Sequence, residues 1–222
     1  MNQPSYHLYH YWRSSSSWRV RIALAWKQIP YSESAVGLLN GESESAEHIK
    51  RNPAGFVPVL ELKVGPHAGN FLTESLAIIC YLEESHPENK FSLLPGDAFA
   101  RAKIMAMVEV INAGVQPFQN ISVLAHFSKD TEEQKKWAMH WIHSGLSTFE
   151  QLAAQNPGNF SYGNQFTLAD VFLIPQLYSA ERFGMSLDEF PCIQKARASS
   201  QDFDAVLKSH PDCFKPIESS TP

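Results

Sequence analysis

Four consecutive serines, Ser14 to Ser17, have the residue type and spacing of a site for an anion. They follow an aromatic-rich stretch with strand character and precede Trp18 to Lys27, where apolar residues recur at helical spacing. At a helix N-terminus, N–H groups and hydroxyls can donate to a bound thiolate or carboxylate, and the helix dipole favours negative charge. A plain helix cap in a polar linker explains the same serines. A serine hydrolase is disfavoured, because no Gly-x-Ser-x-Gly motif is present.

Two further pairs could bind a ligand that resembles a peptide. Pro58 opens a stretch with strand character, and a cis bond there would leave the backbone N–H and C=O of Val57 to pair with such a ligand. A trans proline at an edge strand is the alternative. Glu74 and Ser75 begin an apolar helix, where a carboxylate and a hydroxyl could hold the ammonium and carboxylate of an amino acid. A second helix cap would also explain them.

No metal site is expected, because the nine histidines are dispersed and His140 and His143 lack an acidic or cysteine companion at ligand spacing. The three cysteines, Cys80, Cys192 and Cys213, are too few and too scattered for a disulfide framework. A net charge of −5 argues against a nucleic-acid platform, and no apolar run approaches the roughly 20 residues of a membrane helix. Because no signal peptide is visible either, we expect a cytoplasmic protein that binds neither nucleic acid nor membrane.

The elements that must position these residues divide the chain into two halves. Up to about residue 86 the pattern predicts strand, helix and strand, a polar connection, and then two strands and a helix. After Phe91 to Pro95 the strand signal disappears and only helices are expected. We therefore expect an α+β domain over residues 1–86 and an all-helical domain over 92–222, with a frayed tail from Pro211.

Several helix starts in the second half carry their own signals. Asp97 can cap the first long helix, and Pro191 is placed for the first turn of a later one. Thr131 to Gln134 and Thr167 to Asp170 both fit the capping-box pattern, in which a hydroxyl and an acid or amide three residues later satisfy each other's backbone N–H groups. We expect a helix to begin at each of these positions.

These motifs, with Thr167 to Asp170 in the helical half, together resemble the cytosolic glutathione transferases. Within that family, Arg13 to Leu24 (R-S-S-S-S-W-R-V-R-I-A-L) is similar to the zeta class, the class of the maleylacetoacetate isomerases. Gly114 to Leu124 and Pro175 to Phe183 match the same class. Three separated motifs in the right order make the resemblance specific, and it spans nearly the whole chain.

The resemblance implies a two-domain fold and a cofactor. An α+β thioredoxin-like N-terminal domain with a mixed four-stranded sheet would bind glutathione, and an all-α C-terminal domain would supply most of the substrate pocket. Ser14 or Ser15 would hydrogen-bond the glutathione sulfur at the helix N-terminus. Val57 would pair with the glutathione backbone beside a cis Pro58.

The remaining site residues are also implied by the resemblance. Glu74 and Ser75 would hold the γ-glutamyl end of glutathione, and Arg182 would bind a substrate carboxylate. Arg13 and Arg19 are candidates for local positive charge that lowers the thiol pKa, although Arg19 could equally be structural. Further positions expected in or near the glutathione site are Ser16, Ser17, Gln116, Asn120 and Ser122.

The implied activity is glutathione-dependent cis–trans isomerisation of maleylacetoacetate to fumarylacetoacetate in tyrosine and phenylalanine breakdown, by reversible addition of the glutathione thiolate. A homodimer and a dicarboxylate-type substrate are implied as well. The alternatives are a maleylpyruvate isomerase, a general glutathione transferase, and a non-enzymatic interaction protein of the same fold. The arginine-rich pocket expected of a maleylpyruvate isomerase is not matched at Val115 to Asn120, and an interaction protein would not need the serine, glutamate and arginine positions together.

Two positions depart from the family pattern. The zeta motif usually reads Ser-Ser-Cys, whereas the third position here is Ser16. Because glutathione would supply the nucleophile, isomerisation is expected to survive the loss of that cysteine. A glutamine that the family often places before the Asn-Pro turn falls near Ser43, which would remove one contact with glutathione.

Overall fold

The computed structural model describes residues 4–216, and this part of the chain forms two compact units. The first unit runs up to Phe91 and includes the segment that begins at Phe203. The second unit is Ser92–Asp202. The first unit therefore extends to Phe91, beyond the expected residue 86, and the segment from Phe203 belongs with it, whereas the sequence predicts one helical domain over 92–222.

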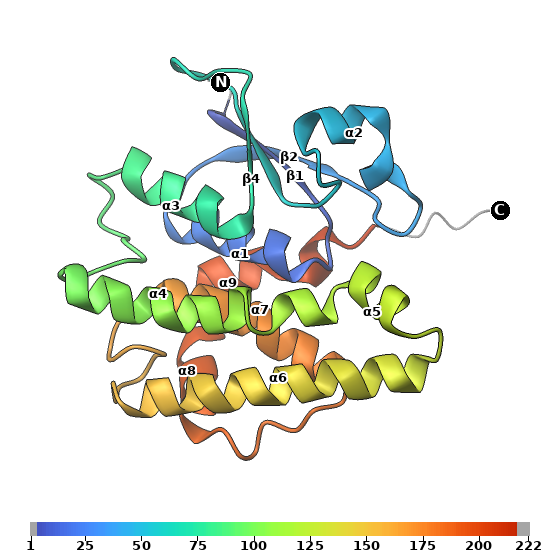
Figure 1. Ribbon diagram of the computed structural model, residues 1–222. Coiled ribbons are helices and arrows are strands. Elements are labelled where there is room, and N and C mark those ends of the chain that lie inside the picture. The colour runs from blue at the N-terminus through green and yellow to red at the C-terminus, as the bar shows by residue number, and fades with distance from the viewer. Residues whose placement is uncertain (1–3, 217–222) are drawn as a thin grey trace. The chain divides into compact units, whose positions relative to one another are not determined.

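The first unit is built on a mixed four-stranded sheet with strand order β2-β1-β3-β4 (Figure 1). Strands β1 and β2 are parallel, whereas β1–β3 and β3–β4 are antiparallel. This confirms the expected thioredoxin-like arrangement, in which a strand–helix–strand unit is followed by two strands and a helix. The strands are β1 (Tyr6–His10), β2 (Tyr31–Ala35), β3 (Val59–Leu62) and β4 (Phe71–Thr73).

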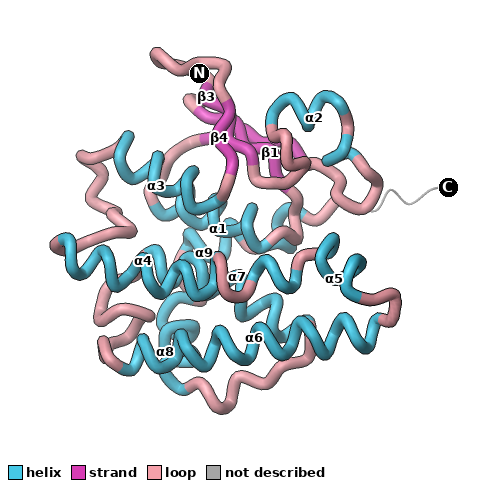
Figure 2. The backbone as a smooth tube through the Cα atoms, in the orientation of Figure 1, coloured by secondary structure: helices cyan, strands magenta, loops and turns pink. Residues whose placement is uncertain are grey.

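Helices cover both faces of this sheet (Figure 2). Alternate residues of β1, including Leu8, are buried on the face that α1 covers, and α1 also packs against α3 and α9. On the other face the guanidinium of Arg51, from α2, lies 4.0 Å from the ring centroid of Tyr9. The helical segments of this unit are α1 (Ser15–Trp26), η1 (Glu42–Glu44), α2 (Ala46–Arg51), α3 (Ser75–Ser85), α9 (Asp204–Ser209) and η3 (Pro211–Phe214).

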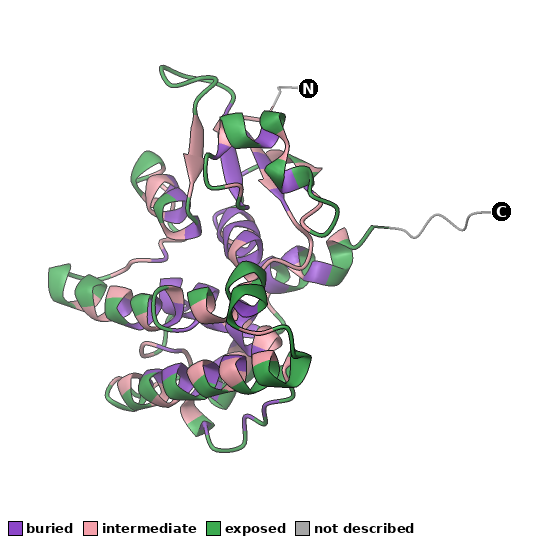
Figure 3. Ribbon diagram, turned by 45° about the vertical axis from the view of Figure 1, so that its right-hand side comes forward, coloured by how far each residue is buried: buried purple, intermediate pink, exposed green. Residues whose placement is uncertain are grey.

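The second unit contains only helices among its regular elements, as expected. Helix α4 packs against α6 and α7, and α6 packs against α8. Buried residues lie on one stripe of α4 and along most of α7 (Figure 3). The elements are α4 (Ala98–Asn112), η2 (Gln116–Gln119), α5 (Ile121–Phe127), α6 (Thr131–Ala154), α7 (Leu168–Arg182) and α8 (Pro191–Ser200).

Three of the four predicted helix-start signals are confirmed, and one is wrong. Asp97 caps α4, Pro191 opens α8, and the capping box of Thr167 and Asp170 is present at α7. The capping box expected at Thr131 is wrong. Asp130 is the N-cap of α6, because its Oδ1 accepts from two amides of the first turn at 2.7 and 3.3 Å and so starts the helix one residue earlier.

The expected frayed tail falls partly outside the described residues, because these end at residue 216. Within the described part, Pro211–Phe214 form the 3₁₀ turn η3, and His210 caps it through its side chain. None of the helices between residues 4 and 216 has the length and apolar content needed to span a lipid bilayer.

Candidate functional site

The sheet register brings three of the candidate segments to the same end of the sheet. Tyr9 near the end of β1 pairs with Val59 at the start of β3, and Val59 pairs with Thr73 at the end of β4. Neighbouring strands lie about 4.8 Å apart, so the residues just beyond these three strand ends are close neighbours. They are the serine segment after β1, Val57-Pro58 before β3, and Glu74-Ser75 after β4.

The serines occupy the start of α1 and do not act alike. Ser14 is the N-cap, and its Oγ accepts from the Ser17 N–H at 3.2 Å, which leaves the Ser14 hydroxyl proton to donate elsewhere. Ser15 and Ser16 are half-buried in the first turn, and neither hydroxyl has a hydrogen-bond partner among the described residues. Ser17 is fully buried, and its Oγ accepts from the Tyr11 N–H at 3.4 Å. Three hydroxyls are therefore available to a ligand at a helix N-terminus.

Val57 and Pro58 are joined by a cis peptide bond, as expected for one of the two possibilities. The carbonyl of Phe56 accepts from Asn52 Nδ2 at 2.9 Å and pairs with His48 Nε2 at 3.0 Å, which holds the chain just before this bond. Val57 itself is buried and makes no backbone hydrogen bond to another residue of the 4–216 range. Its N–H and C=O are the groups that a peptide-like ligand would satisfy.

Glu74 has a left-handed backbone with φ of 65°, although it is not a glycine. Such a conformation costs on the order of 1–3 kcal/mol and is found mainly where the surrounding structure requires it, often at ligand sites. The Glu74 carboxylate is exposed and does not cap α3. Ser75 beside it is buried, and its Oγ accepts from Arg19 Nη1 at 3.3 Å. Arg19 thus links the two helix N-termini, which supports the structural interpretation of this residue.

The cationic side chains near the serines have different exposure. Arg13 is half-buried, with its guanidinium 5.5 Å from the ring centroid of Trp12, whereas Arg19 is fully buried. No role was predicted for Arg21, yet it is also fully buried and contacts the backbone just before the serines. The available signal was a second arginine inside the apolar run of a helix, because a charged residue is rarely buried without a specific set of partners.

The candidates in the second unit belong to η2 and α5. Gln116 is half-buried in η2. Asn120 is the N-cap of α5, and its Oδ1 accepts from both the N–H and the hydroxyl of Ser122 at 3.1 Å. Asn120 and Ser122 therefore have a local structural use that does not depend on any ligand.

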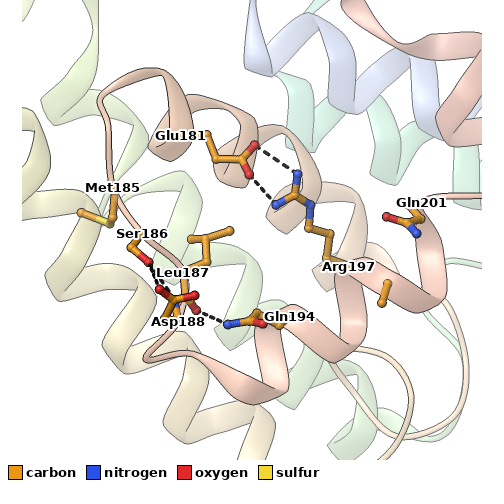
Figure 4. Close-up of a pocket in the computed structure, with 9 residues that line it drawn as sticks. Glu181, Met185, Ser186, Leu187, Asp188, Gln194, Arg197 and Gln201 are labelled. Carbon is orange, nitrogen blue, oxygen red and sulfur yellow. Dashed lines mark hydrogen bonds and ion pairs between the residues drawn. The ribbon is translucent and has the colours of Figure 1, made fainter.

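Arg182 is the last residue of α7 and its side chain is exposed. The neighbouring Glu181 faces a shallow cleft of about 410 Å³, where Arg197 donates to both of its carboxylate oxygens at 2.5 and 3.1 Å (Figure 4). Arg182 is not part of the lining of that cleft, and neither is any other predicted site residue. The arginine in this cleft is already neutralised by a bidentate partner, so it is a poor receptor for a substrate carboxylate.

Two of the chain's three cysteines, Cys80 and Cys192, are poorly suited to serve as the reactive thiol. Burial raises the pKa of Cys80, and burial together with Glu150 raises the pKa of Cys192. Both thiols therefore stay protonated near neutral pH, whereas the thiolate is the nucleophile. The sheet end instead offers hydroxyls and a helix dipole for an anion, a buried backbone pair for a peptide and a carboxylate for an ammonium group. That set can bind a small thiol peptide.

Comparison with known proteins gives two family models and several close relatives. Residues 8–90 match the model "Glutathione S-transferase, N-terminal domain", and residues 142–195 match "Glutathione S-transferase, C-terminal domain". The chain is 39% identical over 206 residues to the probable maleylacetoacetate isomerase 2 of Drosophila melanogaster, covering 92% of this chain and 87% of that protein.

Two solved structures extend the comparison to the fold. Maleylacetoacetate isomerase from Anaeromyxobacter dehalogenans, with glutathione bound in its active site, superposes with a TM-score of 0.85 at 40% identity, covering 96% of this chain and 97% of the other. A bacterial maleyl pyruvate isomerase described as zeta class superposes with a TM-score of 0.86 at 34% identity, covering 95% and 98%. The similarity thus includes both units and nearly the full length of each relative.

Proposed function

The chain belongs to the glutathione transferase family, in its zeta class, and from this we propose that it is a glutathione-dependent maleylacetoacetate isomerase. The observation that carries the proposal is the meeting of three segments at one sheet end. They are the serine N-terminus of α1, the backbone of Val57, which has no backbone partner within residues 4–216, and the strained Glu74 beside Ser75. An isomerase in this class converts maleylacetoacetate to fumarylacetoacetate, a step of tyrosine and phenylalanine breakdown.

The residues at the sheet end fit glutathione, a tripeptide with a thiol and a γ-glutamyl end. Val57 would pair with its backbone beside Pro58, because the N–H and C=O of Val57 find no partner within residues 4–216. Glu74 would accept from its ammonium group, and Ser75, held by Arg19, would contact its γ-glutamyl carboxylate. Once bound, glutathione supplies a thiolate that adds to the cis double bond and is expelled after rotation about the resulting single bond.

The serines are proposed to keep the glutathione thiol ionised and to hold its sulfur in place. Ser14 and Ser15 would donate to the sulfur, and the two N–H groups of the first turn that lack intrahelical partners add positive potential. Ser16 lies in the same turn, where the family pattern has cysteine, and leaves this task unchanged. Ser17 accepts a hydrogen bond from the Tyr11 N–H and so stabilises the loop before the helix. Gln116, Asn120 and Ser122 are proposed to contribute contacts with glutathione from the helical domain, which would supply the substrate pocket.

The first prediction concerns the need for glutathione. The purified protein should isomerise maleylacetone, an accessible analogue of the substrate, only when glutathione is present. S-methylglutathione should occupy the site without supporting turnover, because its sulfur cannot become a thiolate. The rate of isomerisation is measured as the loss of absorbance of the cis isomer, first with glutathione and then with S-methylglutathione. Equal rates with and without glutathione would overturn the thiol-addition mechanism.

The second prediction concerns Arg182, which we propose binds a substrate carboxylate. Arg182→Ala should lower kcat/KM for maleylacetone by about 10- to 100-fold, because a charge-assisted hydrogen bond contributes about 1.5–3 kcal/mol. Conjugation of a neutral electrophile should change by less than about threefold. Arg101→Ala, at another exposed arginine of the helical unit, is the matched control. An equal loss with both substrates would assign Arg182 a structural role.

A maleylpyruvate isomerase is the second candidate, because a zeta-class enzyme of that activity superposes over almost the whole chain. Its chemistry is the same addition and expulsion at a cis double bond, and the substrates differ in the group beyond it. Direct competition between maleylacetone and maleylpyruvate decides between the two. A higher kcat/KM for maleylpyruvate would replace the proposed substrate while keeping the proposed mechanism.

We further propose that the protein is a cytoplasmic homodimer, as the family resemblance implies. Sedimentation equilibrium should then give about twice the mass of one chain, and a mass of one chain at micromolar concentration would contradict the dimer.

A further inference from the structure

The guanidinium of Arg21 is buried inside the first unit. There it donates hydrogen bonds to the loop that precedes α1 and to the C-terminal segment of the unit. Its Nη2 donates to the carbonyl of Trp12 at 3.0 Å, and Nη1 donates to the carbonyl of Tyr11 at 3.5 Å. Its Nε donates to the carbonyl of Ser209, the last residue of α9, at 3.1 Å. The first two acceptors lie in the loop that leads into the serines, and the third lies in the C-terminal segment.

His10 also contacts Arg21, and this contact defines which nitrogen of the His10 ring carries the proton. Its Nδ1 lies 3.0 Å from Nη1 of Arg21, and because arginine only donates, Nδ1 must accept and the ring proton is on Nε2. That nitrogen faces Glu33 Oε2 at 3.6 Å. Burial and the nearby Arg21 lower the pKa of His10 to about 3, so the ring is neutral at neutral pH.

The C-terminal segment closes over this guanidinium. The ring centroid of Phe214 lies 4.5 Å from the Arg21 guanidinium carbon, at a distance where a cation is attracted to a ring face, and the ring also meets His10 edge to face at 5.4 Å. Trp18, three residues before Arg21 on the same helix, donates from Nε1 to Ser209 Oγ at 3.0 Å. Two neighbouring side chains of α1 thus hold the same residue of α9.

We propose that Arg21 is a positioning residue for the Ser14–Ser15 segment and that the C-terminal segment from Ser209 to Phe214 is part of its support. The link is direct at Tyr11, whose carbonyl accepts both from Arg21 and from the Ser14 N–H at 3.1 Å. Arg21 therefore contacts the acceptor of the N-cap amide, and it binds the next carbonyl, that of Trp12, more closely at 3.0 Å. The part of this inference that concerns catalysis rests on the proposed function.

Hydrogen exchange on the full-length protein tests the positioning directly. In Arg21→Lys the charge remains, but a single ammonium nitrogen cannot reach the separated carbonyls that Nε, Nη1 and Nη2 of the planar guanidinium bind. Amides of residues 11–18 should then exchange about tenfold faster, with β3 and β4 unchanged. Phe214→Leu should give a smaller increase in the same segment, and it keeps the test decisive if Arg21→Lys does not fold. Arg197→Lys, the same change at an exposed ion pair, should leave residues 11–18 unaffected.

Kinetics separates a positioning role from a merely structural one. Arg21→Lys should raise the KM for glutathione and the pKa of the bound thiol, and Phe214→Leu should shift both in the same direction. Faster exchange spread evenly over the first unit, or an unchanged segment 11–18 in both folded variants, would overturn the inference. If no variant and no wild-type protein isomerised maleylacetone, the proposed function would fail, but the exchange result would still decide the role of Arg21.

Discussion

Alanine at both Ser14 and Ser15 is expected to raise the pKa of glutathione thiol bound to the protein and to lower kcat/KM for maleylacetone by about 100- to 10,000-fold. Each hydroxyl would donate a charge-assisted hydrogen bond, which contributes about 1.5–3 kcal/mol, and about 1.4 kcal/mol corresponds to a tenfold change in rate. The helix dipole and the unpaired N–H groups remain in the double variant, so activity should fall without vanishing. Titration of the thiolate absorbance of bound glutathione measures the pKa.

The single variants separate catalysis from stability. Ser14→Ala also removes the cap that accepts from the Ser17 N–H, and loss of such a cap costs about 1 kcal/mol. Ser15→Ala removes a hydroxyl that has no partner within the described chain, so it should change the thiol pKa with little effect on stability. Asp130→Ala removes the cap of α6 and is the matched control for cap loss alone. An unchanged thiol pKa in both serine variants would exclude a role for these two hydroxyls.

Local signals predicted the elements of this chain well because their causes are local. Asp97 accepts an amide of its own helix, and Thr167 and Asp170 satisfy each other within one turn, so spacing alone was enough. The same reasoning failed at Thr131 because two residues in a row could serve as the cap. The carboxylate of Asp130 accepts two amides, and that competition between neighbours decided the helix start.

Contacts between distant segments could not be predicted in this way. Ser209 lies 188 residues beyond Arg21, and nothing in the apolar pattern of residues 203–214 indicates that this segment returns to α1. The meeting of the serines, Val57 and Glu74 depends on strand order and register, which a single sequence does not specify. The resemblance to a known family named those residues, and the register supplies the physical reason that they can act together.

The largest expected effect on stability is at Asp170 in the helical unit. Its carboxylate is buried, with Oδ1 accepting from the Ser161 N–H at 2.8 Å and Oδ2 from the N–H and hydroxyl of Thr167 at 2.8 and 3.1 Å. Asp170→Ala leaves two buried N–H groups without an acceptor, and each costs about 1–3 kcal/mol. We expect the free energy of unfolding to fall by about 3 kcal/mol or more, measured by urea titration.

Matched variants test whether this loss comes from the unsatisfied amides. Asp170→Asn keeps one oxygen as an acceptor but turns an NH₂ donor toward the other amide, so its loss of stability should lie between wild type and Asp170→Ala. Asp188→Ala removes an exposed carboxylate that, among the described residues, accepts from Ser186 alone, and it should change stability by no more than about 0.5 kcal/mol. Because α7 begins at this cap and packs against α4, a loss near 3 kcal/mol would disturb the whole helical unit. An unchanged urea midpoint in Asp170→Ala would mean that other groups or water satisfy both amides.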